Sequence, residues 1–336
     1  MKVLIYGYGA VGLYYGLKFT EAGYGVTFLD PGGTSGEVPI QFEDGISGDE
    51  RSKLMRVVSE FPEDETFSLV LVVLPSHYME SHISTLAGIP GSTPVMLLGG
   101  YVTGMEKWAA HIGAKRVVFA YPGVSAVFDR EERRVLYCDR ESGSDELRGV
   151  TVGTLEEETE ADTGAAAGKA EEAEEAEEAG RFCRLFSDAG IPVTRSSGMR
   201  GVYLSQAALR LPITTALLSA GGNLDALAER GDLLRLMIKG IREALAVVRS
   251  SGYRLEPSSL SMYRYVPVFI IANMMKGRFN TASSRIGIEK TALFAGDETE
   301  HLARRFLDIA EKTSVEDTHL HFLFSIFFDD DEEEEE

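Results

Sequence analysis

Short apolar runs recur through the first part of the chain, and amphipathic segments separate them. The main runs cover residues 1–6, 26–29, 68–74, 94–98 and 117–120. Apolar runs without a polar face are typical of strands buried in a parallel sheet. Their spacing of about 25 to 30 residues, with helical periodicity between them (for example over 76–87), indicates βαβ units. The pattern predicts an α/β domain with a mostly parallel sheet.

Weaker patterns extend this domain. Residues 135–138 and 150–152 are expected to form strands of a more antiparallel extension. Between residue 30 and the strand at 68–74, a turn-rich stretch at 31–36 and short polar segments are expected. Residues 169–189 are rich in Ala and Glu and gain an apolar face at Phe182, Leu185 and Phe186. They predict one helix that ends at Gly190, followed by a last short strand over 191–194.

The first apolar run ends in a glycine turn, Gly7-Tyr8-Gly9-Ala10-Val11-Gly12. A G-x-G-x-x-G between a strand and a helix is the dinucleotide-binding fingerprint of the Rossmann fold. Its first glycine permits the tight turn, its second lets the backbone approach a pyrophosphate, and its third lets the helix pack closely on the strand. Because the helix N-terminus offers unpaired N–H groups to phosphates, all of these residues except Tyr8 are predicted cofactor ligands.

An acid, Asp30, ends the second apolar run about 20 residues after the turn, as the fingerprint expects. A carboxylate there accepts hydrogen bonds from ribose hydroxyls and repels a 2′-phosphate, and no Arg or Lys follows before Arg51. Asp30 therefore favours NAD over NADP. The loops that follow later strands, at Leu74-Pro75 and Gly99-Gly100, are expected to complete the cofactor site.

From Arg200 onward the pattern of apolar residues predicts successive helices. They are expected over 200–219, 224–251 with a break near Gly231, 258–276, 286–296 and 298–312, with a terminal apolar helix to about 327. Three regions follow: a dinucleotide-binding Rossmann domain over 1–196 with an acidic insertion at 156–168, a helical domain over 197–328 for substrate binding and dimerisation, and an acidic tail over 329–336.

The formal net charge of −20 comes from two local tracts. Residues 156–178 and 329–336 hold 19 of the 53 acids and one of the 33 bases, so the rest of the chain is almost neutral. Such tracts are usually solvated, and nucleic-acid binding is not expected because phosphate contact needs basic surface. The apolar run at 322–328 is too short to span a membrane.

The cysteines and histidines bear on the cellular location of the protein and on metal binding. Cys138 and Cys183 lack C-x-x-C spacing, and the N-terminus opens directly on a strand, so a cytoplasmic protein is expected. His301, His319 and His321 have no partner cysteines and no i,i+4 ligand spacing. No metal site is therefore expected.

Several segments together resemble the ketopantoate reductase (2-dehydropantoate 2-reductase) family. They are G-Y-G-A-V-G with A-G-Y-G-V-T at 22–27, F-A-Y-P-G at 119–123, F-S-D-A-G-I-P-V at 186–193, L-P-I-T-T-A-L at 211–217 and K-G-R at 276–278. The resemblance implies a Rossmann domain followed by an all-helical domain of the 6-phosphogluconate dehydrogenase C-terminal type. It also implies NADP as the habitual cofactor, in contrast to the indication from Asp30.

The family's catalytic Lys, Asn and Glu residues have no counterparts. Its lysine on the first long helix of the second domain falls at Tyr203, and its two asparagines fall at Ala207 and Leu211. The first asparagine of the chain is Asn223. The other family positions hold Pro75 for a lysine, Gly99-Gly100-Tyr101 for an Asn-Gly, Thr281 for a glutamate and Phe269 for a serine. Ketopantoate reduction by the usual mechanism is therefore not expected.

Other residues are candidates for the chemistry of a carbonyl reduction. Tyr203 lies on one helical stripe with Arg200 and Arg210, so it could donate a proton while the arginines bind a substrate anion. His77 follows a strand end, and a histidine side chain is suited to acid–base work. Lys276 and Arg278 belong to a second donor-rich segment. The alternative is that the stripe is a solvated helix face, His77 an ordinary first-turn residue and the segment a polar loop.

These residues predict an NAD(P)-dependent oxidoreductase that acts on a small carboxylated 2-oxo or 2-hydroxy compound other than ketopantoate. The alternative is a catalytically silent dinucleotide-binding protein, a sensor or an assembly partner. An opine-type dehydrogenase has the same architecture but no distinct residues here. A homodimer through the helical domain is also expected.

Overall fold

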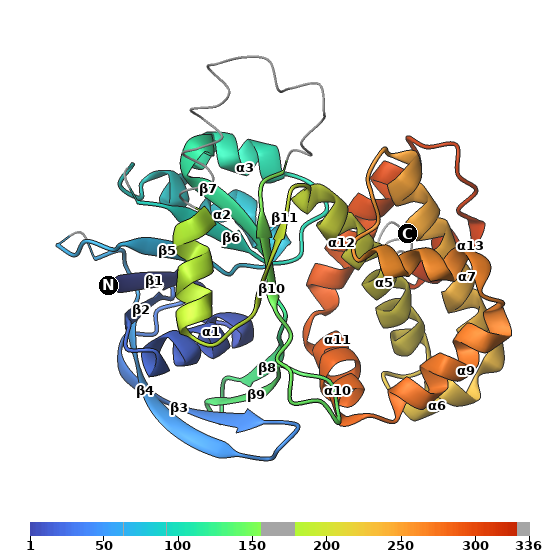
Figure 1. Ribbon diagram of the computed structural model, residues 1–336, viewed down its shortest axis with the longest axis horizontal. Helices are drawn as coiled ribbons and strands as arrows, with labels where there is room; N and C mark the ends of the chain where they lie inside the picture. The colour runs from blue at the N-terminus through green and yellow to red at the C-terminus, as the bar shows by residue number, and fades with distance from the viewer. Residues whose placement is uncertain (63, 92, 156–178, 328–336) are drawn as a thin grey trace, which may run out of the picture. The chain divides into compact units, whose positions relative to one another are not determined.

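The structure is a computed structural model that describes residues 1–62, 64–91, 93–155 and 179–327. The chain divides into two compact units (Figure 1). The first contains Met1–Gly99 and Gly104–Met199, and the second contains Gly100–Thr103 and the chain from Arg200 onward. The expected acidic insertion, the first half of the helix expected over 169–189, and the acidic tail lie outside the described residues.

In the described part of the first unit, eleven strands form one sheet in the order β11-β10-β7-β6-β5-β1-β2-β4-β3-β9-β8. Their bounds are β1 Lys2–Tyr6, β2 Gly25–Leu29, β3 Gly36–Asp44, β4 Glu50–Val58, β5 Leu69–Val72, β6 Val95–Leu98, β7 Val117–Tyr121, β8 Ser125–Asp129, β9 Arg134–Cys138, β10 Val150–Gly153 and β11 Val193–Ser196. The six central strands, β7 to β4, pair in parallel. Because the chain leaves β1 for β2 on one side and returns as β5 on the other, the topological switch point lies at the carboxyl end of β1.

Helices cover both faces of this sheet. They are α1 Ala10–Glu21, η1 Ser76–Tyr78, α2 Met79–Ala87, α3 Met105–Ile112, η2 Ala114–Arg116 and a helix over 179–188. On one face Val3 and Ile5 join the core that contains α1 and the 179–188 helix, where Phe19 packs edge-on to Phe186 at 5.4 Å. Tyr6 faces the opposite side, where its hydroxyl meets His82 of α2 at 2.6 Å. Period-two alternation along β1 therefore separates two helix layers.

Two expectations for the first unit were wrong. Turns follow Asp30 as expected, but in place of the short polar segments expected after them the chain forms the long antiparallel pair β3 and β4. Val38, Ile40 and Phe42 are buried in β3 and alternate with more exposed residues, as in a strand with one face in water. In addition, β9 and β10 do not form one extension, because β9 pairs with β3 and β8 while β10 pairs with β7 and β11.

The described part of the second unit consists of helices and the loops that join them, together with the loop Gly100–Thr103. Its elements are α5 Met199–Ser219, which begins at the last residue of the first unit, α6 Leu224–Glu229, α7 Gly231–Ser250, η3 Ser258–Ser261, α8 Met262–Tyr265, α9 Val268–Phe279, α10 Ala282–Ser284, η4 Arg285–Lys290, α11 Thr291–Phe294, α12 Gly296–Ala310, α13 Thr318–Phe324 and η5 Ser325–Phe327. The core of the unit is built around α5 and α7. The single helix expected over 258–276 was wrong, because Pro267 leaves the preceding Val266 extended at ψ 129° and restarts the chain as α9.

Candidate functional site

The glycine turn connects β1 to α1 at the switch point of the sheet. The N–H of Gly7 donates to the Leu29 carbonyl at 3.1 Å, and Val73 donates to the Tyr6 carbonyl at 2.8 Å, so the ends of β2 and β5 flank the turn. Gly9 is the N-cap of α1 and provides no side-chain acceptor for the first helical N–H groups. The turn thus presents unsatisfied backbone donors at a helix N-terminus, which is the arrangement that binds phosphate.

The three glycines of the turn are needed for different reasons. Gly7 has a φ of +126°, and a Cβ there would lie 2.2 Å from the Val73 carbonyl oxygen. A Cβ on Gly12 would lie 2.5 Å from the Gly7 carbonyl oxygen, so the protein itself requires glycine at both positions. A Cβ on Gly9 would meet no atom within 4 Å, and Gly9 has an extended φ of −114°. Glycine at position 9 is therefore not explained by folding, whereas a pyrophosphate lying against the backbone would require it.

Asp30 follows β2 and is buried, with an exposed fraction of 7%. Its backbone N–H donates to the Val58 carbonyl at 2.8 Å, and its Oδ1 accepts from the N–H of Gly32 at 3.2 Å. Its Oδ2 is buried and has no hydrogen-bond partner among the described residues. Burying a carboxylate oxygen without a donor is costly, so this oxygen is an acceptor that a bound hydroxyl would satisfy.

A cavity of about 410 Å³ opens at the end of β4, beside the Val58 carbonyl to which Asp30 is bonded. Its lining includes Val57, Val58 and Ser59 from β4 and the residue after it, and Gly36 from the start of β3. In a doubly wound sheet, ligands bind beyond the carboxyl ends of the strands.

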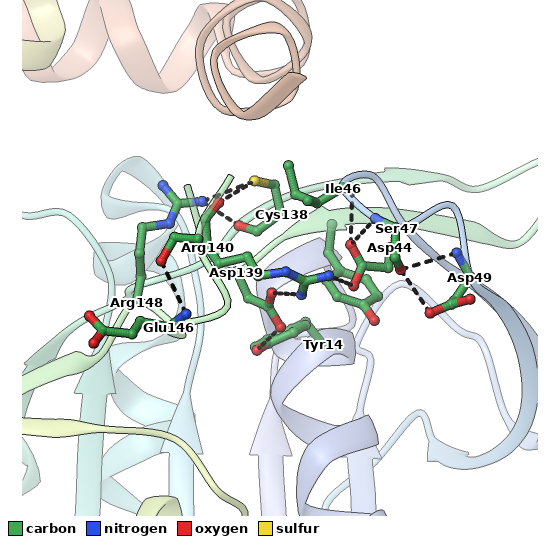
Figure 2. Close-up of polar contacts among 12 residues, drawn as sticks. Tyr14, Asp44, Ile46, Ser47, Asp49, Cys138, Asp139, Arg140, Glu146 and Arg148 are labelled. Atoms are coloured by element: carbon green, nitrogen blue, oxygen red, sulfur yellow. Dashed lines mark hydrogen bonds and ion pairs between the residues drawn. The ribbon is translucent and has the colours of Figure 1, made fainter. Parts of the chain in front are cut away.

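A buried network of charges anchors α1 (Figure 2). The Asp139 carboxylate, 1% exposed, accepts from the Tyr14 hydroxyl at 3.0 Å and from Arg140 Nη1 at 2.8 Å, and Lys18 Nζ lies 3.5 Å away. Arg140 also donates to Asp44 at 2.7 Å. Burial and the Asp139 charge raise the pKa of Tyr14 far above its usual value. Since Tyr14 and Lys18 lie on α1, the network fixes the helix whose N-terminus forms the glycine turn.

The other predicted cofactor residues lie at neighbouring strand ends. Leu74 and Pro75 follow β5, and the Leu74 side chain would be 3.5 Å from a Cβ on Gly7. Gly99 follows β6 and donates to the Ala120 carbonyl at 3.1 Å. His77 lies in η1 directly after Ser76, half-buried, with its ring 4.0 Å from that of Tyr78. All of these positions except Gly100, which belongs to the second unit, lie in the unit that carries the glycine turn.

In the second unit, the loop after β6 meets α5 through two tyrosines. Tyr101 and Tyr203 are each 1% exposed, and their rings make an edge-on contact with centroids 5.3 Å apart. Burial, and to a smaller degree the charge of Glu298, raises the pKa of Tyr101 well above its usual range. Tyr203 therefore does not lie on a solvated helix face. Tyr203 stands where the family has its lysine, and Tyr101 belongs to the segment where the family has Asn-Gly. These two positions therefore carry a buried aromatic pair.

The candidate anion ligands are dispersed within the second unit. Arg200 lies over the Tyr253 ring at 5.8 Å, whereas Arg210 and Arg278 are exposed and Lys276 is half-buried on α9. In the donor-rich segment, Thr281 caps α10 by accepting from the N–H of Ser284, and Arg285 pairs with Asp225 and Glu289. Local capping and ion pairing therefore account for much of this segment.

Sequence reasoning missed one cation beside the glycine turn. Arg130, in the turn between β8 and β9, donates to the Tyr8 carbonyl at 3.4 Å and lies over the Phe128 ring at 5.7 Å. It is more than 100 residues from the turn in sequence, and only the pairing of β8 and β9 beside α1 brings it there. Among the described residues, no group of three metal-ligating side chains occurs, and no helix is long and apolar enough to cross a membrane.

Residues 3–135 match the sequence model of the family described as ketopantoate reductase PanE/ApbA, which confirms the resemblance inferred from the sequence. No curated protein matches the chain. Solved structures share the fold over nearly the entire chain, as the following three illustrate.

One is 2-dehydropantoate 2-reductase from Geobacter metallireducens GS-15, with 16% identity, a TM-score of 0.69, and 98% of this chain and 99% of that chain covered. Another is D-mandelate dehydrogenase in a ternary complex with NADH and anilino(oxo)acetate, with 15% identity, a TM-score of 0.68, and 98% and 97% covered. The third is a dimeric ketopantoate reductase from Staphylococcus aureus, with 13% identity, a TM-score of 0.64, and 97% of both chains covered. At these identities the likeness establishes the Rossmann-type α/β unit with its helical second unit.

Proposed function

We propose that the protein is an NAD(P)-dependent oxidoreductase that acts on a small carboxylated 2-oxo or 2-hydroxy compound other than ketopantoate. The observation that carries this proposal is the open space at Gly9, between two glycines that the protein needs for its own packing. The D-mandelate dehydrogenase neighbour, solved with NADH and an oxoacid-type ligand, supports the same class of chemistry. When bound, a nicotinamide cofactor supplies or accepts a hydride.

The cofactor is assigned to Gly7, Gly9, Ala10, Val11 and Gly12 for its pyrophosphate and to Asp30 for its adenosine ribose. The Asp30 Oδ2, which has no hydrogen-bond partner in the described part of the chain, supports NAD, because a carboxylate accepts from a ribose hydroxyl and repels a 2′-phosphate. The family habit supports NADP. Leu74, Pro75, Gly99 and Gly100 are assigned to the nicotinamide end, since they end the strands on the other side of β1.

Proton transfer is assigned to Tyr203, with His77 as the other candidate. A phenol keeps its proton at neutral pH and can donate it to an oxygen on which negative charge develops. Contact with Tyr101 holds the Tyr203 ring in one orientation. Arg200, Arg210, Lys276 and Arg278 are the candidate ligands of a substrate carboxylate, for which a guanidinium offers two parallel donors.

The test is turnover of NADH and NADPH with a panel of 2-oxo acids, and of NAD and NADP with the corresponding 2-hydroxy acids. Wild-type protein is expected to turn over at least one pair. In that assay Tyr203→Phe, which keeps the ring contact and removes the hydroxyl, is expected to lower kcat about 100-fold or more. Tyr101→Phe is the matched control for loss of a buried phenol. An unchanged kcat in Tyr203→Phe would remove Tyr203 as the acid.

A second candidate function is a catalytically silent dinucleotide-binding protein. The buried Tyr101–Tyr203 pair favours it, because aromatic packing has replaced polar residues of the family's catalytic set. Tight binding of a dinucleotide without turnover of any member of the panel would support this candidate over the enzyme.

A homodimer through the helical unit is part of the proposal. Tyr265, Phe269 and Met274, on α8 and α9, are large apolar side chains that are 74%, 66% and 55% exposed, and an interface would remove such side chains from water. The dimeric Staphylococcus aureus reductase supports the same assembly. Light scattering after size exclusion is expected to give twice the chain mass, and Phe269→Asp is expected to give the monomer. A wild-type monomer would contradict the proposal.

A further inference from the structure

The turn between β8 and β9 reaches the glycine turn from a distant part of the sequence. It consists of Arg130, Glu131, Glu132 and Arg133, and Asp129 fixes it by accepting from the N–H groups of Glu131 at 2.9 Å and Glu132 at 3.0 Å. Arg133 has a left-handed φ of +53° and closes the turn into β9. Two cations therefore come from one constrained turn.

An aromatic chain joins this turn to the cofactor loop. Tyr8, which lies between Gly7 and Gly9, makes edge-on contacts with Phe28 of β2 at 6.0 Å and with Phe128 of β8 at 5.6 Å. The Arg130 guanidinium lies over the Phe128 ring and donates one N–H to the Tyr8 carbonyl. The ring stacking orients the guanidinium, and the bond to Tyr8 holds it against the backbone of the glycine turn.

The same charged groups act on the pKa of Tyr8. Burial raises the pKa of Tyr8, the charges of Arg133 and Arg130 oppose that rise, and the charge of Asp30 adds to it. The charges of Arg130, Arg133 and Asp30 thus all affect the pKa of the Tyr8 hydroxyl. Of these groups, Arg130 contacts the backbone of the turn directly, through its bond to the Tyr8 carbonyl.

A dinucleotide brings two negative charges to the pyrophosphate position. The first turn of α1 is Ala10-Val11-Gly12-Leu13, so it carries no cation, and a helix N-terminus supplies only about half a positive charge. A guanidinium has five donors, and the bond from Arg130 to the Tyr8 carbonyl uses one of them. On the basis of the proposed function, we infer that Arg130, assisted by Arg133, binds a phosphate of the dinucleotide cofactor. The turn between β8 and β9 thus supplies a positive charge, whereas no Lys or Arg follows Asp30 before Arg51.

The experiment measures binding of NADH and NADPH, by nucleotide fluorescence, to wild-type protein and to Arg130→Ala, Arg130→Lys and Arg133→Ala. Arg130→Ala is expected to weaken binding about 10- to 100-fold, as expected for loss of a hydrogen-bonded charge, and to reduce its dependence on salt. Arg130→Lys should recover part of the affinity, because it restores the charge without the planar fork. Equal losses for both nucleotides assign the pyrophosphate, whereas a loss confined to NADPH assigns the 2′-phosphate.

Lys115→Ala is the matched control. Lys115 is exposed and lies at the amino end of β7, whereas the glycine turn follows the carboxyl end of β1, which runs in the same direction; its loss changes the net charge equally. Fluorescence of Trp108 in urea, a readout independent of nucleotide, verifies that each variant is folded. Two results would overturn this inference and leave the proposed function standing. One is unchanged affinity of folded Arg130→Ala for both nucleotides, and the other is an equal loss of affinity in Lys115→Ala. Wild-type protein that binds neither nucleotide would contradict the proposed function and the inference together.

Discussion

Replacement of Asp139 by Asn tests the buried network that anchors α1. The change keeps the volume of the side chain but removes the negative charge between Arg140 Nη1, 2.8 Å away, and Lys18 Nζ, 3.5 Å away. The amide NH₂ that replaces one carboxylate oxygen is itself a hydrogen-bond donor. It therefore cannot accept from the Tyr14 hydroxyl or from the cations around it. The side chain is 2% exposed, so water cannot replace the lost interactions.

The expected cost follows from this geometry. Removal of one partner from a buried ion pair costs about 3–5 kcal/mol, because it leaves an uncompensated buried charge. Arg140 keeps a second carboxylate, Asp44, and Lys18 is partly exposed, so the lower end of the range applies. We therefore expect Asp139→Asn to lower the free energy of unfolding by about 3 kcal/mol, a large share of the total of about 5–15 kcal/mol for a typical domain.

Urea unfolding followed by tryptophan fluorescence isolates this effect. The chain has one tryptophan, Trp108, which is 3% exposed in α3, so its emission reports on the first unit. Asp145→Asn is the matched control, since Asp145 is exposed in the same region of the chain, and it should stay within about 0.5 kcal/mol of wild type. If Asp139→Asn and Asp145→Asn had equal unfolding midpoints, the reasoning on the network would be refuted.

Three further predictions concern residues around the site. Burial alone would raise the pKa of Asp44, but the N–H groups of Ile46 and Ser47 and the guanidinium of Arg140 outweigh it and lower the pKa. The stability that Asp44 contributes is therefore present above the unfolded pKa of about 4 and lost below it. The difference in unfolding midpoint between wild type and Asp44→Asn should shrink between pH 6 and pH 3, and a constant difference would contradict it. Asp30→Arg is expected to move the ratio of NADH to NADPH affinity toward NADPH, and an unaltered ratio in titrations would remove Asp30 as the ribose ligand. Gly12→Ala is expected to destabilise the first unit by about 1–3 kcal/mol, because its Cβ would lie 2.5 Å from the Gly7 carbonyl oxygen; wild-type stability in urea would disprove the close packing.

The sequence was sufficient for the parts of the fold that depend on local pattern. Buried runs such as Leu69–Val72 and Val95–Leu98 have no polar face, so strand and parallel pairing could both be inferred. The β3–β4 pair was missed, although Val38, Ile40 and Phe42 alternate in the manner of a strand. Strands with one face in water carry polar residues at every second position. In β3 these positions and Pro39 made the segment look like a polar loop.

The long-range parts of the site depend on register, which the sequence does not encode locally. Asp139 and Tyr14 are 125 residues apart, and Arg140 and Asp44 are 96 apart. They meet only because β9 pairs in parallel with β3 beside α1. The burial of Tyr203 likewise depends on the loop that carries Tyr101, so helical periodicity alone suggested a solvated stripe.

The most direct test of the central claim is NADH and NADPH binding to wild-type protein and to Gly9→Ala. The space around Gly9 and its extended backbone predict a folded variant, with a free energy of unfolding within about 1 kcal/mol of wild type. We expect wild-type protein to bind at least one of the nucleotides and Gly9→Ala to weaken that binding at least tenfold, because the new methyl group occupies the position of the pyrophosphate. Wild-type protein that binds neither nucleotide, or a Gly9→Ala variant with wild-type affinity, would contradict this claim.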